Sequence, residues 1–415
     1  MNAADSTLRS LSRLNLTLAA MQAGFGPFVA VRLAASGWDA GTIGLALSAG
    51  TIASVAAQVP SGMILDHAGT RRGFAGAAIL GTMAALVMLS LAPGYVLVFG
   101  AEIVQGGAGV GLSLAIAAIT LSLSRQERLA ERLGNNVRFA AIGASGGTAL
   151  LGAIASWGSP SAAFLLAAAF GVPALLALRG IRAADLATAD RRTSHHTAPP
   201  PRARRAHPTR ARALLRDRRL LALLAVAALF QLANASLLPL AANTVSRQAG
   251  PRADLVIAAA VISSQLLAAW LSPRVGAAAQ SHGRRIVLML GLAAVPLRAV
   301  GFALSGTIAP ILACELLDGV SAATIGVLIP LIAADITHRG GRFNLALGTA
   351  GLVSALAASL STTLSGVIAD RAGLPAAYLA LAACGLGAIL AVAALLPETA
   401  HLPAAHAAHE RSLAA

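Results

Sequence analysis

Long apolar runs, separated by short polar segments, constrain the fold of this chain more than any other feature. A helix of about 20 apolar residues crosses the roughly 30 Å hydrocarbon core of a bilayer. Hydrophobic residues make up 57% of the chain and charged residues only 11%, whereas about a quarter of a soluble domain is charged. Backbone groups in lipid must be hydrogen-bonded internally, and the runs do not alternate as barrel strands would. We therefore expect an all-α integral membrane protein.

The runs divide into two sets of six. The predicted transmembrane helices lie at 14–35, 40–65, 73–92, 94–123, 139–157, 161–179, 220–241, 254–273, 286–305, 308–334, 343–369 and 376–396. This pattern predicts twelve transmembrane helices in two pseudo-symmetric six-helix bundles. The predicted division is an N-terminal bundle at 1–178, a cytoplasmic linker rich in Arg and Pro at 179–219, a C-terminal bundle at 220–396 and a cytoplasmic tail at 397–415.

The arginines are distributed unevenly between the two sides of the predicted membrane. All 31 basic residues are arginine, and a cytoplasmic N-terminus places 26 of them on the cytoplasmic side. Because cytoplasmic loops are enriched in Lys and Arg, we expect both termini in the cytoplasm. No small-residue cleavage site follows the first run, so this run is expected to be a retained helix. The expected location is the inner (plasma) membrane, with multiple passes.

The arginines that give the chain its net charge of +15 lie mostly on the predicted cytoplasmic side of the membrane. The expected partner of this charge is therefore the lipid bilayer and not nucleic acid. The linker alone holds twelve arginines, and we interpret it as a solvated segment lying against anionic lipid. Nothing fixes the geometry of the histidines in the linker and tail, so no metal and no cofactor are expected. Cys314 and Cys384 fall in apolar runs, which makes a disulfide framework unexpected. The expected state is a monomer.

A glycine-rich hinge between apolar runs occurs twice. The first copy consists of Gly62, Asp66, Gly69, Arg71 and Arg72, and the second of Gly276, Gln280, Gly283, Arg284 and Arg285. A second pair of motifs, Glu102–Gln105–Gly106 and Glu315–Asp318–Gly319, has nearly the same offset of 213 positions. Two unrelated motifs with a shared offset predict a duplicated six-helix unit, the parallel repeat used for alternating access.

The hinge resembles the loop signature of the major facilitator superfamily of secondary transporters, Gly-x-x-x-Asp-(Arg/Lys)-x-Gly-x-(Arg/Lys)-(Arg/Lys). Positions 62–72 match it, except that His67 replaces a basic residue. Twelve spans, a basic central loop and a second, weaker copy extend the resemblance over nearly the whole chain. The resemblance implies a bacterial transporter of this superfamily, with no substrate subgroup assigned.

In this family the hinge contributes to a cytoplasmic gate. Asp66 can accept hydrogen bonds from the N-terminal amides of the eleventh helix, whose dipole favours an anion, and Arg342 at that helix start can pair with it. The alternative for Arg71 and Arg72 is that they only enforce topology. Gln280 occupies the position of an acid in the second copy, so we expect it to accept hydrogen bonds from the fifth helix without charge. The gate is therefore predicted to be asymmetric.

Four charged residues lie well inside the predicted spans, away from their ends: Glu102, Arg298, Glu315 and Asp318. Each costs about 2.5–3.5 kcal/mol at a helix centre, so such residues usually face a cavity or a partner. Arg298 and Glu315 lie at similar depths on two helices joined by a short turn, at about 1.5 Å per residue, so a hairpin ion pair is feasible. Asp318 shares the face of Glu315. With one arginine for two acids, one carboxyl is left to bind a proton or a cation.

Glu102 occupies the position equivalent to Glu315 in the first half, and the family's antiporter signature has Arg there. We interpret Glu102 as the first candidate for proton coupling, with structural pairing and direct substrate contact as alternatives. Softer candidates for the substrate cavity are Gln22, Phe25, Gln105, Gln231 and Asn234, although amides inside membrane helices often only bond neighbouring helices.

The sequence therefore predicts a proton-coupled secondary transporter that works by alternating access on a small solute. Efflux of a small organic or toxic compound, as in an antiporter, is slightly preferred. The alternatives are uptake of a small metabolite, or a membrane sensor or scaffold that transports nothing. No nucleophile elbow, Walker loop or metal-ligand spacing occurs, so an enzyme is not expected.

Overall fold

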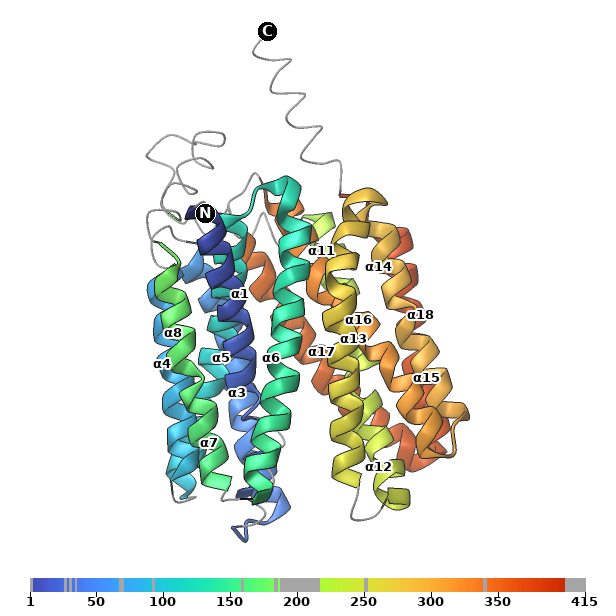
Figure 1. Ribbon diagram of the computed structural model, residues 1–415. Helices are drawn as coiled ribbons and strands as arrows, with labels where there is room; N and C mark the ends of the chain where they lie inside the picture. The colour runs from blue at the N-terminus through green and yellow to red at the C-terminus, as the bar shows by residue number, and fades with distance from the viewer. Residues whose placement is uncertain are drawn as a thin grey trace. The chain divides into compact units, whose positions relative to one another are not determined.

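The computed structural model is mainly helical in its described residues, which are 3–25, 28–29, 32–33, 36–66, 71–91, 94–157, 160–182, 186, 217–249, 253–338 and 342–399 (Figure 1). The helices are α1 (Ala3–Gln22), α3 (Ala40–Leu65), α4 (Arg71–Ser90), α5 (Tyr95–Leu123), α6 (Leu129–Trp157), α7 (Pro160–Ala169), α8 (Gly171–Gly180), α11 (Arg218–Asn234), α12 (Leu237–Ala249), α13 (Ala253–Ser281), α14 (Arg284–Leu292), α15 (Ala294–Leu304), α16 (Ile308–Thr337), α17 (Phe343–Ala372) and α18 (Leu374–Leu395). A 3-10 turn at Gln126–Arg128 precedes α6.

The described part of the chain contains eleven helices or helix pairs that are long and apolar enough to cross a membrane. They correspond to the second to twelfth predicted spans. The first predicted span, 14–35, includes residues outside the described part, and α1 begins earlier, at Ala3. Helix α6 begins ten residues before the predicted 139, because its polar first turns continue the helix beyond the apolar run. The all-α membrane fold is confirmed.

Many large apolar side chains of these helices are exposed. Val96 is 87% exposed, Leu304 83% and Leu255 72%. Large contiguous apolar surfaces are rare on soluble monomers. The exposed apolar surface is therefore suited to lipid.

Three predicted spans are each divided into two helices. The divisions fall at Phe170, between α7 and α8; at Ala235–Ser236, between α11 and α12; and at Ala293, between α14 and α15. Each lies three or four residues before a proline, namely Pro173, Pro239 and Pro296. A proline removes one i→i−4 hydrogen bond and its ring clashes with the carbonyl of residue i−4, which breaks or kinks the helix at that point. Pro60, Pro273 and Pro330 lie within unbroken helices.

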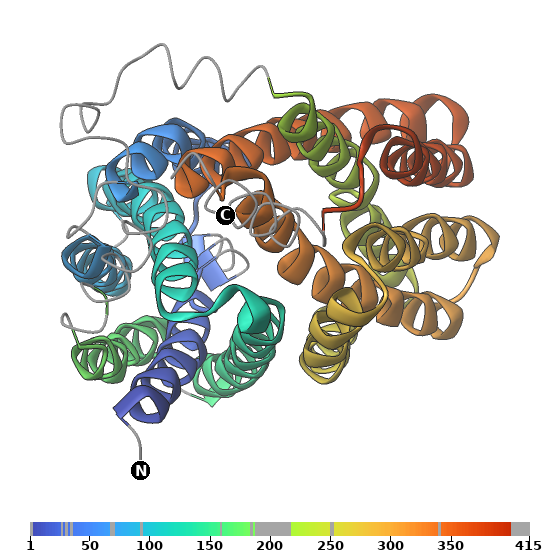
Figure 2. The same cartoon turned by 90° about the horizontal axis from the view of Figure 1, so that it is seen from above.

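The helices form two compact units. One comprises residues 1–125 and 135–196, and the other 126–134 and 197–415. Figure 2 shows the helices of each unit nearly end-on. Residues 126–134 group with the second unit, although the predicted division places them in the N-terminal bundle. The predicted linker and tail lie largely outside the described residues, so their boundaries stay predictions. All the histidines of the linker and tail also lie outside the described residues.

The two units repeat the same order of helices. The first residues of α3 and α13, of α4 and α14, and of α5 and α16 are each 213 positions apart: Ala40 and Ala253, Arg71 and Arg284, Tyr95 and Ile308. This spacing is the offset between the sequence motifs. The predicted pseudo-symmetry is therefore present in the helices themselves.

Each unit contains a close approach between two of its helices. A Cβ added at Gly106 of α5 would overlap the main-chain oxygen of Gly50 in α3. In the second unit, a Cβ at Gly319 of α16 would overlap the main-chain oxygen of Ser264 in α13. Gly106 and Gly319 are equivalent in the repeat. Small residues allow membrane helices to approach in this way.

We predict that Gly106→Ala destabilises the protein by about 1–3 kcal/mol, the usual cost of overpacking. The measurement is thermal unfolding of the purified protein in detergent. The matched control is Gly107→Ala, where an added Cβ meets nothing within 4 Å. Equal melting temperatures for the two variants would contradict the close approach of α3 and α5.

Candidate functional site

A buried ion cluster joins α15 and α16 in the second unit. The guanidinium of Arg298 donates from Nε to Glu315 Oε2 over 3.0 Å and from Nη2 to Oε1 over 3.1 Å. Its Nη1 donates to Asp318 Oδ1 over 2.5 Å. Arg298 and Glu315 are each only 2% exposed, and the side chain of Asp318 is 23% exposed. The predicted hairpin pairing of Arg298 with Glu315 is confirmed.

Asn234 connects this cluster to α11. Its Oδ1 accepts from Arg298 Nη1 over 3.0 Å, and its Nδ2 donates to Asp318 Oδ1 over 3.3 Å. The arginine also lies 5.5 Å from the ring centroid of Phe302, which packs edge-on against Tyr378. The prediction that one carboxyl is left without the arginine is wrong, because the forked guanidinium reaches both acids. With both acids ionised the cluster still carries one net negative charge.

Glu102 has no such partner in the first unit. It lies in α5 and is 7% exposed. A Cβ added at Gly50 of α3 would lie 2.8 Å from Glu102 Oε2, so the carboxyl packs against α3. The buried Oε1 of Glu102 and the Oε1 of Gln105 accept no hydrogen bond from the described residues. Glu102 is therefore a buried acid without a counter-ion in the part of the chain that the structure describes.

The repeat explains this difference. Glu102 is equivalent to Glu315 and Gln105 to Asp318, each pair 213 positions apart. At the same offset, the position of Arg298 is occupied by Ala85, which is fully buried in α4. The first unit therefore has the acid, but an alanine at the position equivalent to the arginine.

The softer cavity candidates belong to both units: Gln22, Phe25 and Gln105 lie in the first, and Gln231 and Asn234 in the second. Gln231 is half-buried on α11, one turn before Asn234. Gln22 ends α1, and Phe25 follows the end of that helix; both are half-buried. Only Asn234 joins the ion cluster, and the roles of the others stay predictions.

The first copy of the hinge ties four helices of its unit together. Arg71, at the start of α4, donates to the main-chain oxygen of Leu65 over 3.5 Å and to Ser122 Oγ over 2.5 Å. Arg72 donates to the main-chain oxygen of Arg179 in α8 over 3.4 Å. The two arginines therefore hold α4 to α3, α5 and α8, beyond any role in topology.

Other residues of the first copy are less completely described. Gly62 is buried near the end of α3, Asp66 is the C-cap of that helix, and Gly69 lies outside the described residues. Arg342 is the N-cap of α17 in the second unit. The pairing of Asp66 with Arg342 or with the α17 amides stays a prediction.

The second copy contains a buried ion pair that the sequence interpretation missed. Arg284, 5% exposed, donates from Nε to Asp335 Oδ2 at the end of α16 over 3.0 Å. Thr399 donates to the same oxygen over 3.0 Å. Arg284 and Asp335 are equivalent to Arg71 and Ser122. The contact is repeated, but only the second copy has an acid in it.

Gln280 does not act as predicted. It donates through Nε2 to the main-chain oxygen of Glu127, whereas we expected it to accept. Near it, a Cβ at Gly276 would overlap the main-chain oxygen of Ala130. A carbonyl accepts but cannot donate, so an amide nitrogen satisfies it where a carboxylate would not.

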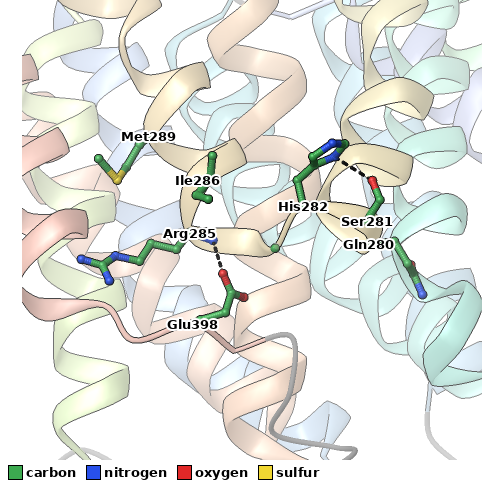
Figure 3. Close-up of a pocket in the computed structure, with 8 residues that line it drawn as sticks. Gln280, Ser281, His282, Arg285, Ile286, Met289 and Glu398 are labelled. Carbon is green, nitrogen blue, oxygen red and sulfur yellow. Dashed lines mark hydrogen bonds between the residues drawn. The ribbon is translucent and has the colours of Figure 1, made fainter.

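Glu398 supplies a further acid beside Gly283, whose φ of 92° is the left-handed value that glycine tolerates. Its carboxylate accepts from the main-chain nitrogens of Arg284 over 3.0 Å and Arg285 over 3.1 Å, at the start of α14 (Figure 3). An anion at a helix N-terminus satisfies unpaired amides. The only signal in the sequence was that Asp335 and Glu398 each border a long apolar run.

The amino-acid sequence matches the model of one known protein family. The model of the Major Facilitator Superfamily matches residues 13–275, which is more than half of the chain. The chain belongs to the major facilitator superfamily. It is therefore a multi-pass membrane transporter, and membership in this transporter family agrees with the expectation that it is not an enzyme.

Relatives and solved structures agree with this family. Two uncharacterized MFS-type transporters of Mycobacterium tuberculosis, from strains CDC 1551 / Oshkosh and ATCC 25618 / H37Rv, are each 29% identical over 396 residues, covering 94% of this chain and 93% of theirs. The fold is similar to that of the Escherichia coli fucose:proton symporter FucP, with a TM-score of 0.69, 12% identity and coverage of 94% and 99%. The proton:xylose symporter XylE gives a TM-score of 0.74, 15% identity and coverage of 97% and 98%. These two likenesses concern the fold alone.

Proposed function

We propose that this transporter couples the movement of a small organic solute to protons, with Glu102 as the proton carrier. The supporting observation is that Glu102 is buried with no counter-ion in the described part of the chain, while its repeat partner Glu315 pairs with Arg298.

Burying an ionised carboxyl group in the membrane costs free energy. An ionised carboxyl at a helix centre costs about 2.5–3.5 kcal/mol, whereas the protonated carboxyl carries no charge. Among the described residues no arginine pairs with Glu102 to offset this cost, so its protonation state changes when water reaches it. Access of water from alternate sides would then load the proton on one side and release it on the other.

The Arg298 cluster is the proposed contact for the solute. Arg298 and Glu315 are fixed and buried, while Asp318 keeps an exposed fraction of 23%. The net negative charge of the cluster favours a neutral, zwitterionic or cationic solute over an anionic one. Glu315 and Asp318 are the second candidates for proton coupling.

Export of the solute, by antiport with protons in the inner membrane, is the proposed direction. The arginine distribution supports cytoplasmic termini, and the monomer is the proposed working unit. Uptake is the alternative, and it is favoured by the fold shared with two proton symporters, FucP and XylE.

The experiment is a screen of compounds with inverted membrane vesicles that contain the protein. An imposed pH gradient should drive accumulation of at least one compound in inverted vesicles if the direction is export. Accumulation only in right-side-out vesicles would establish uptake instead. A compound that is carried at a rate independent of the pH gradient would contradict proton coupling.

We also predict that Asp66→Asn shifts the transporter toward its inward-open state, because the carboxylate no longer holds the start of α17. The measurement is labelling of single cysteines placed along α5 and α16 from the cytoplasmic side, which should become several-fold faster. The matched control is Gln280→Ala at the equivalent position of the second copy. An unchanged labelling pattern in Asp66→Asn would count against the proposed gate.

A further inference from the structure

A cavity lined by arginines lies where three spans of the second unit end. Arg218 and Arg219 begin α11, Arg285 lies in the first turn of α14, and the segment 393–397 ends α18. Together they border a cavity of about 320 Å³. Arg218 and Arg219 are exposed and Arg285 is half-buried. Three arginine residues therefore border one cavity at the boundary of the membrane.

The nearby acids are engaged elsewhere. The carboxylate of Asp217 accepts from the main-chain nitrogen of Arg219 over 2.8 Å and so caps α11. The carboxylate of Glu398 accepts from main-chain nitrogens at the start of α14, and Figure 3 shows the Arg285 side chain extending away from it. No ion pair involves Arg218, Arg219 or Arg285 among the described residues.

Arg285 is held in position without being neutralised. Its Nη2 donates to the main-chain oxygen of Ala393, in the last turn of α18. This bond uses one of the five donors of the guanidinium and leaves its charge in place. Arg285 therefore holds a positive charge beside the cavity.

The rest of the lining is apolar. Ala393, Ala394, Leu395, Leu396 and Pro397 form the α18 side of the cavity. The spans themselves run from Arg218, from Arg284 and to Leu395, so the cavity lies at the depth where hydrocarbon gives way to headgroups. Arginine forks match phosphate oxygens, and basic pockets between transmembrane helices bind anionic headgroups.

We propose that this cavity binds the phosphate of an anionic phospholipid, with Arg218, Arg219 and Arg285 around the phosphate and the α18 segment against the glycerol and upper acyl chain. The shared chemistry is a phosphate ester, and the apolar side of the cavity selects a lipid over free phosphate. The proposal does not depend on proton coupling or on Glu102.

The test is native mass spectrometry of the purified full-length protein in detergent, with phosphatidylglycerol, phosphatidylcholine and inorganic phosphate as probes. We expect preferential binding of phosphatidylglycerol. The double variant Arg218→Gln, Arg219→Gln should weaken it roughly fivefold for each arginine, and so roughly 25-fold in all at low salt. The matched control is Arg274→Gln, which removes an exposed arginine that stacks 3.8 Å from the Trp270 ring in α13; its affinity should stay at the wild-type value.

Three results would overturn the proposal. The first is equal binding of phosphatidylglycerol by the double variant and the wild type. The second is equal affinity for phosphatidylcholine and phosphatidylglycerol. The third is displacement of the lipid by millimolar inorganic phosphate, which would identify a site for free phosphate. Because the substituted arginines are exposed, the double variant and Arg274→Gln should elute and unfold like the wild type in the absence of added lipid. The shifts in melting temperature on adding phosphatidylglycerol should rank the proteins in the same order as their affinities.

Discussion

Replacing Glu102 by Gln is expected to abolish accumulation of the solute against its gradient while leaving solute exchange intact. The amide keeps the shape of the carboxyl but cannot bind and release a proton. One pH unit is worth about 1.4 kcal/mol per proton, so the wild type can concentrate a solute about tenfold per coupled proton under a gradient of one unit. The variant should only equilibrate the solute.

The measurement is steady-state accumulation in vesicles with an imposed pH gradient, alongside counterflow of labelled solute. The matched control is Asp370→Asn, which removes an exposed acid near the end of α17 and should accumulate solute like the wild type. If Glu102→Gln loses both counterflow and accumulation, the result would instead point to a structural or solute-binding role for this residue.

Arg298→Met is expected to produce the largest loss of stability. Arg298 is 2% exposed and bonds to two carboxylates and one amide. Removing one partner of a buried ion pair costs about 3–5 kcal/mol, because the remaining charge is left uncompensated. Thermal unfolding in detergent should show a lower melting temperature than for any single carboxyl-to-amide change in the cluster.

A combined variant separates charge from packing. Arg298→Met with Glu315→Leu and Asp318→Asn removes every charge of the cluster, and apolar replacements of buried ion groups are often neutral in stability. We therefore expect the combined variant to recover most of the loss. If it unfolds at the same temperature as Arg298→Met alone, the loss comes from packing, and the account of the cluster is wrong.

The sequence was sufficient to predict the second to twelfth spans, the repeat and one ion pair. Apolar run length determines where helices cross lipid, and the short turn before α16 places Arg298 and Glu315 at the same depth. The isolation of Glu102 also follows from the sequence once the repeat aligns Ala85 with Arg298. A short turn between two helices predicts which residues are neighbours, and a duplication predicts which residues occupy equivalent positions.

Contacts between distant segments were not accessible in this way. Asp335 pairs with Arg284 across 51 positions, and Glu398 reaches the start of α14 from beyond the last span. Both acids border apolar runs, where a charge is ordinarily explained by the membrane boundary. Gln280 was given the wrong polarity because its partner is a carbonyl, which only the fold reveals. The helix breaks accompany Pro173, Pro239 and Pro296, but Pro60, Pro273 and Pro330 lie within unbroken helices, so proline positions alone do not predict where a span divides.

The most direct test of proton coupling through Glu102 is proton movement driven by solute in proteoliposomes containing a pH-sensitive dye. With no imposed pH gradient, a solute gradient should change the internal pH in liposomes with wild-type protein or Asp370→Asn. Liposomes with Glu102→Gln should exchange solute with no change in internal pH. If liposomes with Glu102→Gln show the same change in internal pH per transported solute molecule as the wild type, the assignment of Glu102 as the proton carrier is contradicted.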